Sequence, residues 1–208
     1  MPTRQNIAPP NLVIAPKEYE QRYQDQLNNV QRLFYAQIAN AINSPLPYGS
    51  FITSGDFTNY DSAGNSTANQ LKLVPFSTQT DGFNTKIGNI PTRLYVAETG
   101  VYNVQFSAQC DLSSGSQGAG YFWLRKNGEN IPATTGKVVV AIPNAETMAA
   151  WNYVLVLQAG DYIELAWESS DVHFFLTSEA ANTIRPSLPA VILTITWVSS
   201  YNTSVGIS

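Results

Sequence analysis

The chain has little charge of either sign. Only 12% of its 208 residues are Asp, Glu, Lys or Arg, and 15 acidic against 11 basic residues leave a formal net charge of −4. A protein that binds nucleic acid needs a basic surface to replace the counterions of the phosphates. The composition therefore argues against nucleic acid as a partner, and it indicates a surface that is polar but weakly ionic or partly covered by other molecules.

Cysteine is nearly absent, and long apolar runs are missing. Cys110 is the single cysteine, and no stretch approaches eighteen consecutive apolar residues. One thiol can form neither an internal disulfide nor a cysteine-based zinc site. Without a long apolar run we expect no membrane insertion. Stability must then come from burial or assembly, with Cys110 buried in a strand.

Motifs for catalysis are also scarce. His173 is the only histidine, and Asp171, Ser169 and Ser170 precede it closely. Closeness in sequence does not make the three side chains of a Ser-His-Asp triad converge, nor does it supply an oxyanion hole. The pair at residues 136–137 (GK) lacks the earlier glycine and the following hydroxyl residue of a phosphate loop. We therefore expect no enzymatic activity and no cofactor.

The acidic residues are scattered rather than clustered. They lack the density of a calcium loop, which leaves open a calcium ion at the loop ends. Glu164 and Glu168 lie four residues apart on one predicted strand, without the facing carboxylate that a glycosidase needs. We expect the tryptophans to pack in the core or at an interface rather than to stack on sugars. They are Trp123, Trp151, Trp167 and Trp197.

Proline is concentrated at the N-terminus. Four prolines within residues 1–16 prevent a helix or a central strand, so this segment should form an extended arm. Apolar side chains lie between the prolines and would be exposed on an isolated chain. We predict that the arm docks on a neighbouring protein, and a disordered tail is the alternative. The expected docking residues are Ile7, Pro9, Pro10, Leu12, Val13 and Ile14.

Residues 17–43 contain no glycine or proline, and their apolar residues follow a helical spacing. This pattern predicts one helix, roughly 40 Å long at about 1.5 Å per residue, which ends before Pro45. Its apolar seam consists of Tyr23, Leu27, Val30 and Phe34. The spacing alone leaves open whether the seam forms a short trimeric coiled coil or packs on the chain's own head.

After Pro47 the sequence consists of short runs of β-branched and aromatic residues, separated by Gly, Asn, Asp and Ser. Residues 101–110 alternate between apolar and polar side chains, as in a strand with one face in solvent. Eleven predicted strands indicate an antiparallel sandwich or barrel. They cover residues 48–53, 70–76, 85–90, 93–98, 101–110, 121–126, 137–142, 148–158, 161–168, 174–178 and 190–198.

Three segments, in this order, resemble the complement globular-head and tumour necrosis factor superfamily. They are residues 99–106 (TGVYNVQF), 123–129 (WLRKNGE) and 154–165 (VLVLQAGDYIEL). The resemblance covers roughly residues 92–198, and it implies a ten-strand jelly roll that forms a tight homotrimer. The residues that carry it in turns and strands are Gly100, Tyr102, Lys126, Asn127, Gly128, Gly160 and Asp161.

No collagen-like repeat precedes the head, and an arm and a helix take its place. This order looks more like the virion proteins of tailed bacteriophages. We therefore predict a mainly β chain that has an arm (1–16), a helix (17–44), a jelly-roll head (47–198) and a tail (199–208).

The predicted function is that of a non-enzymatic, homotrimeric virion protein. It would serve as a spike, a fibre or a capsid decoration whose arm binds other capsid or tail proteins. Whether the head also contacts a host-surface receptor or a glycan stays open. The alternative is a free lectin-like or protein-binding recognition module of the complement and tumour necrosis factor type.

Overall fold

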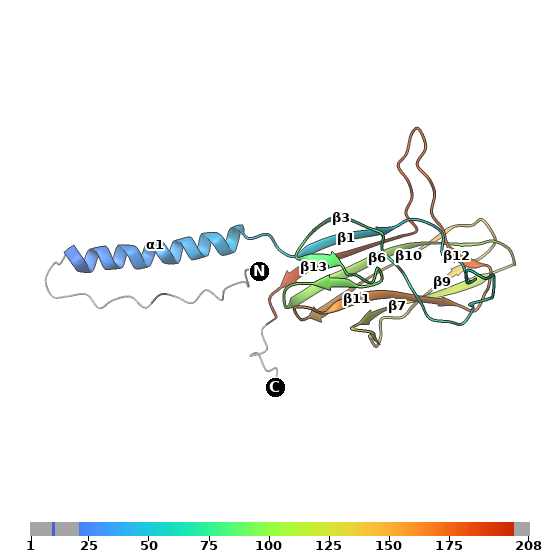
Figure 1. The fold of residues 1–208 in the computed structure, drawn as a ribbon, viewed down its shortest axis with the longest axis horizontal. Coiled ribbons are helices and arrows are strands. Elements are labelled where there is room, and N and C mark those ends of the chain that lie inside the picture. The colour runs from blue at the N-terminus through green and yellow to red at the C-terminus, as the bar shows by residue number, and fades with distance from the viewer. Residues whose placement is uncertain (1–9, 11–20, 202–208) are drawn as a thin grey trace. The chain divides into compact units, whose positions relative to one another are not determined.

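The protein is described by a computed structural model that covers residue 10 and residues 21–201, apart from the side chains of residues 41 and 42. The chain divides into a first unit that ends at Pro45 and a second unit that begins at Leu46. The first unit contains helix α1 (Gln21–Asn43), and the second contains thirteen strands within the described residues (Figure 1).

Helix α1 has one half-buried face. Tyr23, Leu27, Val30 and Phe34 all lie on this face at steps of four and three residues, as the sequence predicts. On the other faces, Leu33 and Tyr35 leave 54% and 66% of their surface exposed. In the described part of the chain, no helix combines the length and the apolar character needed to cross a membrane.

The second unit is a sandwich of two antiparallel sheets. In the first sheet the order is β10 (Thr147–Leu157), β6 (Gly100–Leu112), β13 (Val191–Ser199), β1 (Tyr48–Thr53) and β3 (Thr78–Phe83), and β12 (Phe174–Leu176) also pairs with β6. In the second sheet the order is β4 (Thr85–Ile87), β5 (Leu94–Val96), β11 (Tyr162–Ser169), β7 (Gly118–Lys126) and β8 (Glu129–Asn130). There β2 (Lys72–Leu73) pairs with β11, and β9 (Gly136–Val140) pairs with β7. Strands that are distant in sequence thus pair across each sheet, and the fold is the predicted jelly-roll sandwich.

The core lies between the two sheets and is built by alternation along the strands. On β6, for example, Tyr102, Val104 and Phe106 are buried while the residues between them face outward. Phe106 contacts Phe122 and Trp151 at ring-centroid distances of 5.9 and 5.4 Å, which joins the two sheets at the centre.

The predicted strands agree with the observed ones where the alternation is long, and they differ elsewhere. The prediction missed β3 and β8. The predicted strand at 70–76 shrinks to β2, because Pro75 cannot donate a ladder hydrogen bond. Strand β13 runs one residue past the predicted end of the head, to Ser199, which pairs with Val101.

Candidate functional site

Apart from Asp111 at the end of β6, which is only 7% exposed, the outer face of the first sheet carries no charged residue on four adjacent strands. We call this surface the uncharged face. It consists of the outward side chains of β10, β6, β13 and β1, which are Met148, Ala150, Asn152, Val154, Val156, Val101, Asn103, Gln105, Ser107, Gln109, Ile192, Thr194, Thr196, Val198, Tyr48, Ser50 and Ile52.

Strand register arranges these residues in rows across the sheet. One row runs from Ala150 through Ser107 and Ile192 to Ile52, and a parallel row begins at Val154. Several apolar members are well exposed, with Val154 at 66% and Met148 at 59% of their surface. Exposed apolar area without charge is typical of the centre of a protein interface.

The two sheets differ in this respect. The outer side of the second sheet carries exposed Lys86 on β4 and Lys137 on β9, together with Glu168 on β11. On the strands of the first sheet, exposed charge begins at β3, where the Asp81 carboxylate accepts a hydrogen bond from the Tyr48 hydroxyl at 3.2 Å. This bond and the negative charge of Asp81 raise the pKa of Tyr48. The absence of charge is therefore a property of one face and not of the whole head.

Low overall charge makes this face hard to recognise from the sequence. The sequence predicted the alternation of a wet and a dry side at residues 101–110. It did not show that β10, β6, β13 and β1 are neighbours, because those pairings join segments far apart in the chain. Only the register turns four polar-looking strands into one continuous surface.

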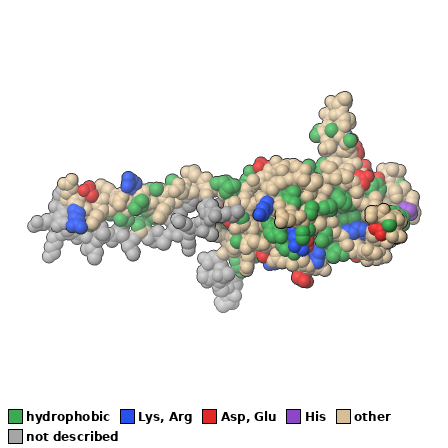
Figure 2. Space-filling view, viewed as in Figure 1, with side chains coloured by type: hydrophobic (Ala, Val, Ile, Leu, Met, Phe, Trp, Pro, Cys, Tyr) green, Lys and Arg blue, Asp and Glu red, His purple; other side chains and the backbone are tan. Residues whose placement is uncertain are grey.

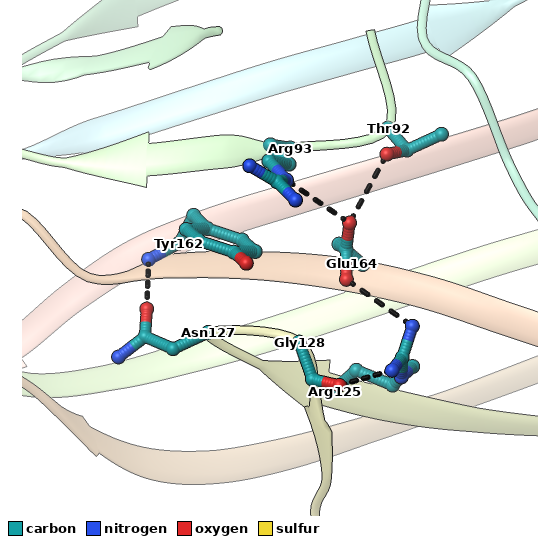
Figure 3. A network of polar contacts seen from close by, with 7 residues as sticks. All are labelled: Thr92, Arg93, Arg125, Asn127, Gly128, Tyr162 and Glu164. Carbon is teal, nitrogen blue, oxygen red and sulfur yellow. Dashed lines mark hydrogen bonds and ion pairs between the residues drawn. The ribbon is translucent and has the colours of Figure 1, made fainter. Parts of the chain in front are cut away.

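On the outer side of the second sheet lies a buried ion-pair network (Figure 3). Glu164 on β11 is 2% exposed, and its Oε1 accepts hydrogen bonds from Thr92 Oγ1 at 3.1 Å and from Arg93 Nε at 3.4 Å. Its Oε2 lies 3.5 Å from Nη1 of Arg125, and Nη2 of the same guanidinium donates to the Gly128 carbonyl. Both carboxylate oxygens are thus engaged by neighbouring side chains, and Glu164 ties β7, β11 and the start of β5 together.

The residues that carry the family resemblance meet at two turns. Asn127 and Gly128 have positive φ values of 52° and 88°, which closes the tight turn between β7 and β8. Asn127 Nδ2 donates to Asp161 Oδ1 at 2.7 Å, and Lys126 lies 3.9 Å from the same carboxylate. Gly160 (φ 92°) completes the second turn. Lys126, Asn127, Gly128, Gly160 and Asp161 thus lie together where the end of β7 meets the start of β11.

The other two motif residues define the beginning of β6. Tyr102 is buried, and its hydroxyl donates to the Glu98 carbonyl at 2.7 Å. A Cβ at Gly100 would lie 2.2 Å from Trp197 Nε1, so no larger residue fits there without a shift. The contacts of the motif residues are thus structural.

The surroundings of His173 do not form a catalytic triad. The Asp171 carboxylate accepts a hydrogen bond from the backbone N–H of His173 at 2.8 Å and not from the imidazole. Ser169 bonds to the backbone of Asp171, and the hydroxyl near the ring, 3.4 Å from Nδ1, belongs to Ser113. The arrangement resembles a capped turn between β11 and β12.

The remaining candidates from the sequence also have structural contacts. At Gly136 a Cβ would lie 2.7 Å from the Trp151 ring, so the pair at 136–137 begins a packed strand rather than a phosphate loop. Asp61 accepts hydrogen bonds from the Asn65 side chain and from the backbone of Ala63 and Asn65, and these bonds lower its pKa. Within the described ranges, no group of three or more His, Cys, Asp or Glu side chains is placed to hold a metal ion.

Cys110 and three of the four tryptophans lie in or against the core, as the sequence predicts, and Trp123 lies outside it. Trp167 and Trp197 are buried in the core, and Trp151 is half-buried against it. Trp123 is half-buried, and its indole N–H donates to Asn130 Oδ1 at 2.8 Å. Cys110 is fully buried, and this burial raises the pKa of its thiol to about 12.

The predicted docking arm falls outside the described residues, apart from Pro10. Its role stays a prediction. The four seam residues of α1 share one half-buried face, as described above. Their role as a contact between helices is likewise a prediction.

Comparisons with known proteins give similarity of fold only. No family model matches the chain, and no curated protein matches it. Similar solved structures include the globular domain of zebrafish complement 1qA protein, with 11% identity, 74% of this chain and 99% of that chain covered, and a TM-score of 0.45. They also include Eiger TNF from S. frugiperda (13%, 79% and 100% covered, TM-score 0.44) and murine APRIL (9%, 73% and 99% covered, TM-score 0.44). Nothing about activity or partners follows from similarity at this level.

Proposed function

We propose that this chain is a non-enzymatic structural protein of a tailed-bacteriophage virion, and that it works as a homotrimer whose jelly-roll head is displayed on the particle. The observation that carries the proposal is the uncharged face. A surface of this kind is suited to be covered by another copy of the chain.

The size of the uncharged face fits a stable subunit contact. The four strands β10, β6, β13 and β1 have 11, 13, 9 and 6 residues. At a mean of about ten residues, about 3.3 Å per residue and about 4.8 Å between strands, they give an area on the order of 600 Å². A standard interface takes roughly 800 Å² from each partner. The exposed valine, methionine and isoleucine side chains would supply the apolar part, and the interleaved Asn, Gln, Ser and Thr side chains would supply hydrogen bonds.

Three copies around one axis are favoured by two further observations. The resemblance of residues 99–106, 123–129 and 154–165 implies a homotrimeric head. The seam of α1 has the spacing of a short coiled coil, so the helices of three copies can pair as well. A closed three-fold ring uses a heterologous contact, in which the uncharged face of one copy meets a different surface of the next.

The virion location is supported by the order of segments in the sequence. A proline-rich arm and a helix precede the head, and both suit attachment to a larger assembly. An arm kept extended by prolines loses little conformational entropy when it is laid into a groove. Burying its four aliphatic side chains would contribute about 6 to 12 kcal/mol before the cost of ordering.

The test is a truncated chain that begins at Lys17. It is expressed in a host cell that is infected with a phage from which the gene for this protein has been deleted. We expect the truncated chain to fold and trimerise but to be missing from purified particles. The matched control replaces Thr3 and Arg4 by alanine, which changes the arm outside its apolar anchors and should leave incorporation normal. Incorporation of the truncated chain at the normal level would contradict a docking role.

A free recognition module is the second candidate, and the same resemblance favours it. Such a module would bind a receptor or a glycan through its head whether or not residues 1–16 were present. Glycan-array binding that is unchanged by the truncation, together with absence of the full chain from particles, would decide for this alternative.

A further inference from the structure

A long excursion interrupts the strand that crosses the first sheet between β6 and β1. Strand β12 ends with Leu176 opposite Cys110, and β13 begins with Val191 opposite Ala108. Both ends of the excursion bond to Gln109, whose carbonyl accepts from the N–H of Thr177 and whose N–H donates to the Ala190 carbonyl. Strands β12 and β13 therefore continue each other along β6 as one line of the sheet. Residues 178–189 form a loop that leaves this line opposite Gln109. We call residues 178–189 the finger.

The finger leaves the sheet at the end of the uncharged face, at Gln109. Strand β6 pairs along one side of this line, and on the other side the Ala190 N–H donates to the Thr53 carbonyl. The inner side is filled by the core. Figure 1 shows the finger standing off the sandwich, away from β7 and β11.

The finger is braced along its length. Ser178 donates to the Asp56 carboxylate at the base, and Glu179 and Leu188 exchange two backbone hydrogen bonds of 2.9 Å. At the tip, Asn182 Oδ1 accepts the N–H groups of Ile184 and Arg185 at 2.8 and 2.9 Å. A loop with these bonds holds its tip in one conformation, which lowers the entropy lost on binding.

The tip presents one apolar side chain and no net charge. Ile184 is 95% exposed, more than any other large apolar residue in the described part of the chain. Glu179 and Arg185 are the only charged residues of the finger, and they pair with each other. Figure 2 shows the finger as a mostly uncharged projection. Such a surface suits an uncharged partner better than an acidic or basic one.

We propose that the finger clasps a second copy of this chain, with Ile184 packed against the neighbouring head. This inference rests on the proposed trimer. A chain that covers the uncharged face lies beside the finger, because the finger leaves the sheet at Gln109, the last outward β6 residue of that face.

The test uses site-specific photo-crosslinking of the full chain. Cys110 is fully buried, so an Ile184→Cys variant carries one accessible thiol for a benzophenone maleimide. The matched control is Ile90→Cys, at a 47% exposed position in the turn between β4 and β5 of the other sheet. We expect illumination to join Ile184→Cys to another copy of the chain, with the crosslinked peptides mapped by mass spectrometry, and to leave the control uncrosslinked.

A second measurement gives the strength of the contact. Ile184→Asp should raise the concentration at which half of the trimers dissociate by about tenfold or more, and Ile90→Asp should not change it. The clasp would be overturned, and the trimer would stand, if three results came together. The unmodified chain would be a trimer, Ile184→Cys would crosslink no more than Ile90→Cys, and Ile184→Asp would leave the dissociation of the trimer unchanged. A crosslink to a different virion protein would also overturn it. A monomeric unmodified chain would instead contradict the proposed trimer itself.

Discussion

Glu164 joins three separate parts of the second sheet through its two carboxylate oxygens. Replacing it by Gln leaves Arg93 and Arg125 without their counter-charge at a position that is 2% exposed. Breaking a buried ion pair on one side costs about 3 to 5 kcal/mol. Because the arginine side chains keep 33% and 17% of their surface in solvent, we expect a smaller loss, about 2 kcal/mol. Chemical denaturation of the two proteins measures it.

The control for Glu164 is Glu168→Gln on the same strand. Glu168 lies on the same outer side but is only half-buried, and it forms no ion pair in the part of the chain that the structure describes. Its replacement should change the free energy of unfolding by less than about 0.5 kcal/mol. Equal effects of the two substitutions would show that the network adds nothing to stability.

Cys110 gives a prediction about pH. Burial raises the pKa of its thiol to about 12, so the native thiol stays protonated and should not react with thiol reagents between about pH 7 and 9. In the unfolded chain the thiol ionises near pH 8.5. The unfolded state therefore loses this proton first, and the contribution of Cys110 to stability falls as pH rises from about 9 toward 12. A Cys110→Ala variant should lack that part of the pH dependence. Rapid labelling of the native chain at pH 8 would contradict the prediction.

At the scale of elements, the seam of α1 is the clearest target. Leu27 and Phe34 both lie on the half-buried face. An Asp at either position would place a charge in the seam, at a cost of several kcal/mol if the helices of a trimer bury it. We expect Leu27→Asp and Phe34→Asp to weaken the trimer and to lower its melting temperature.

The matched control for the seam is Gln31→Asp, on an exposed face of the same helix. It introduces the same charge and a similar loss of helix propensity, but not into the seam. If all three variants assemble and melt like the unmodified chain, α1 is a solvated spacer.

The sequence predicted elements better than it predicted their arrangement. Strand β6 was located closely because long alternation of apolar and polar residues is a strong local signal, and β1 and β10 were located from their β-branched and aromatic residues. Strand β3 (TQTDGF) was missed because it is an edge strand with polar residues on both faces, and backbone hydrogen bonds to β1 hold it in place. Local patterns contain no such information.

The candidate sites show the same limit. The tight turn at Asn127 and Gly128 could be predicted, because its residues are adjacent. The partners of Glu164 could not, since Arg93 and Arg125 are 71 and 39 residues away in the chain. The finger is visible only from the register that makes β12 and β13 one line.

At the scale of the whole molecule, the account depends on how the head associates. The uncharged face, the finger at its end and the seam of α1 are separate features, and each suits contact with further copies of the chain. Val154 is the most exposed of the large apolar residues on the uncharged face, at 66%. It is therefore the position at which a charge tests the face with the least effect on folding.

Sedimentation equilibrium of the full chain at micromolar concentration is the most direct test of the proposed homotrimer. We expect a mass three times the 22.8 kDa of one chain. Val154→Asp should shift the mass toward that of one chain, because the interface would bury an unpaired carboxylate. Leu71→Asp, at a 50% exposed position next to β2 of the other sheet, should leave it unchanged. An unmodified chain that sediments at 22.8 kDa, or a trimer that Val154→Asp does not weaken, would contradict assembly through the uncharged face.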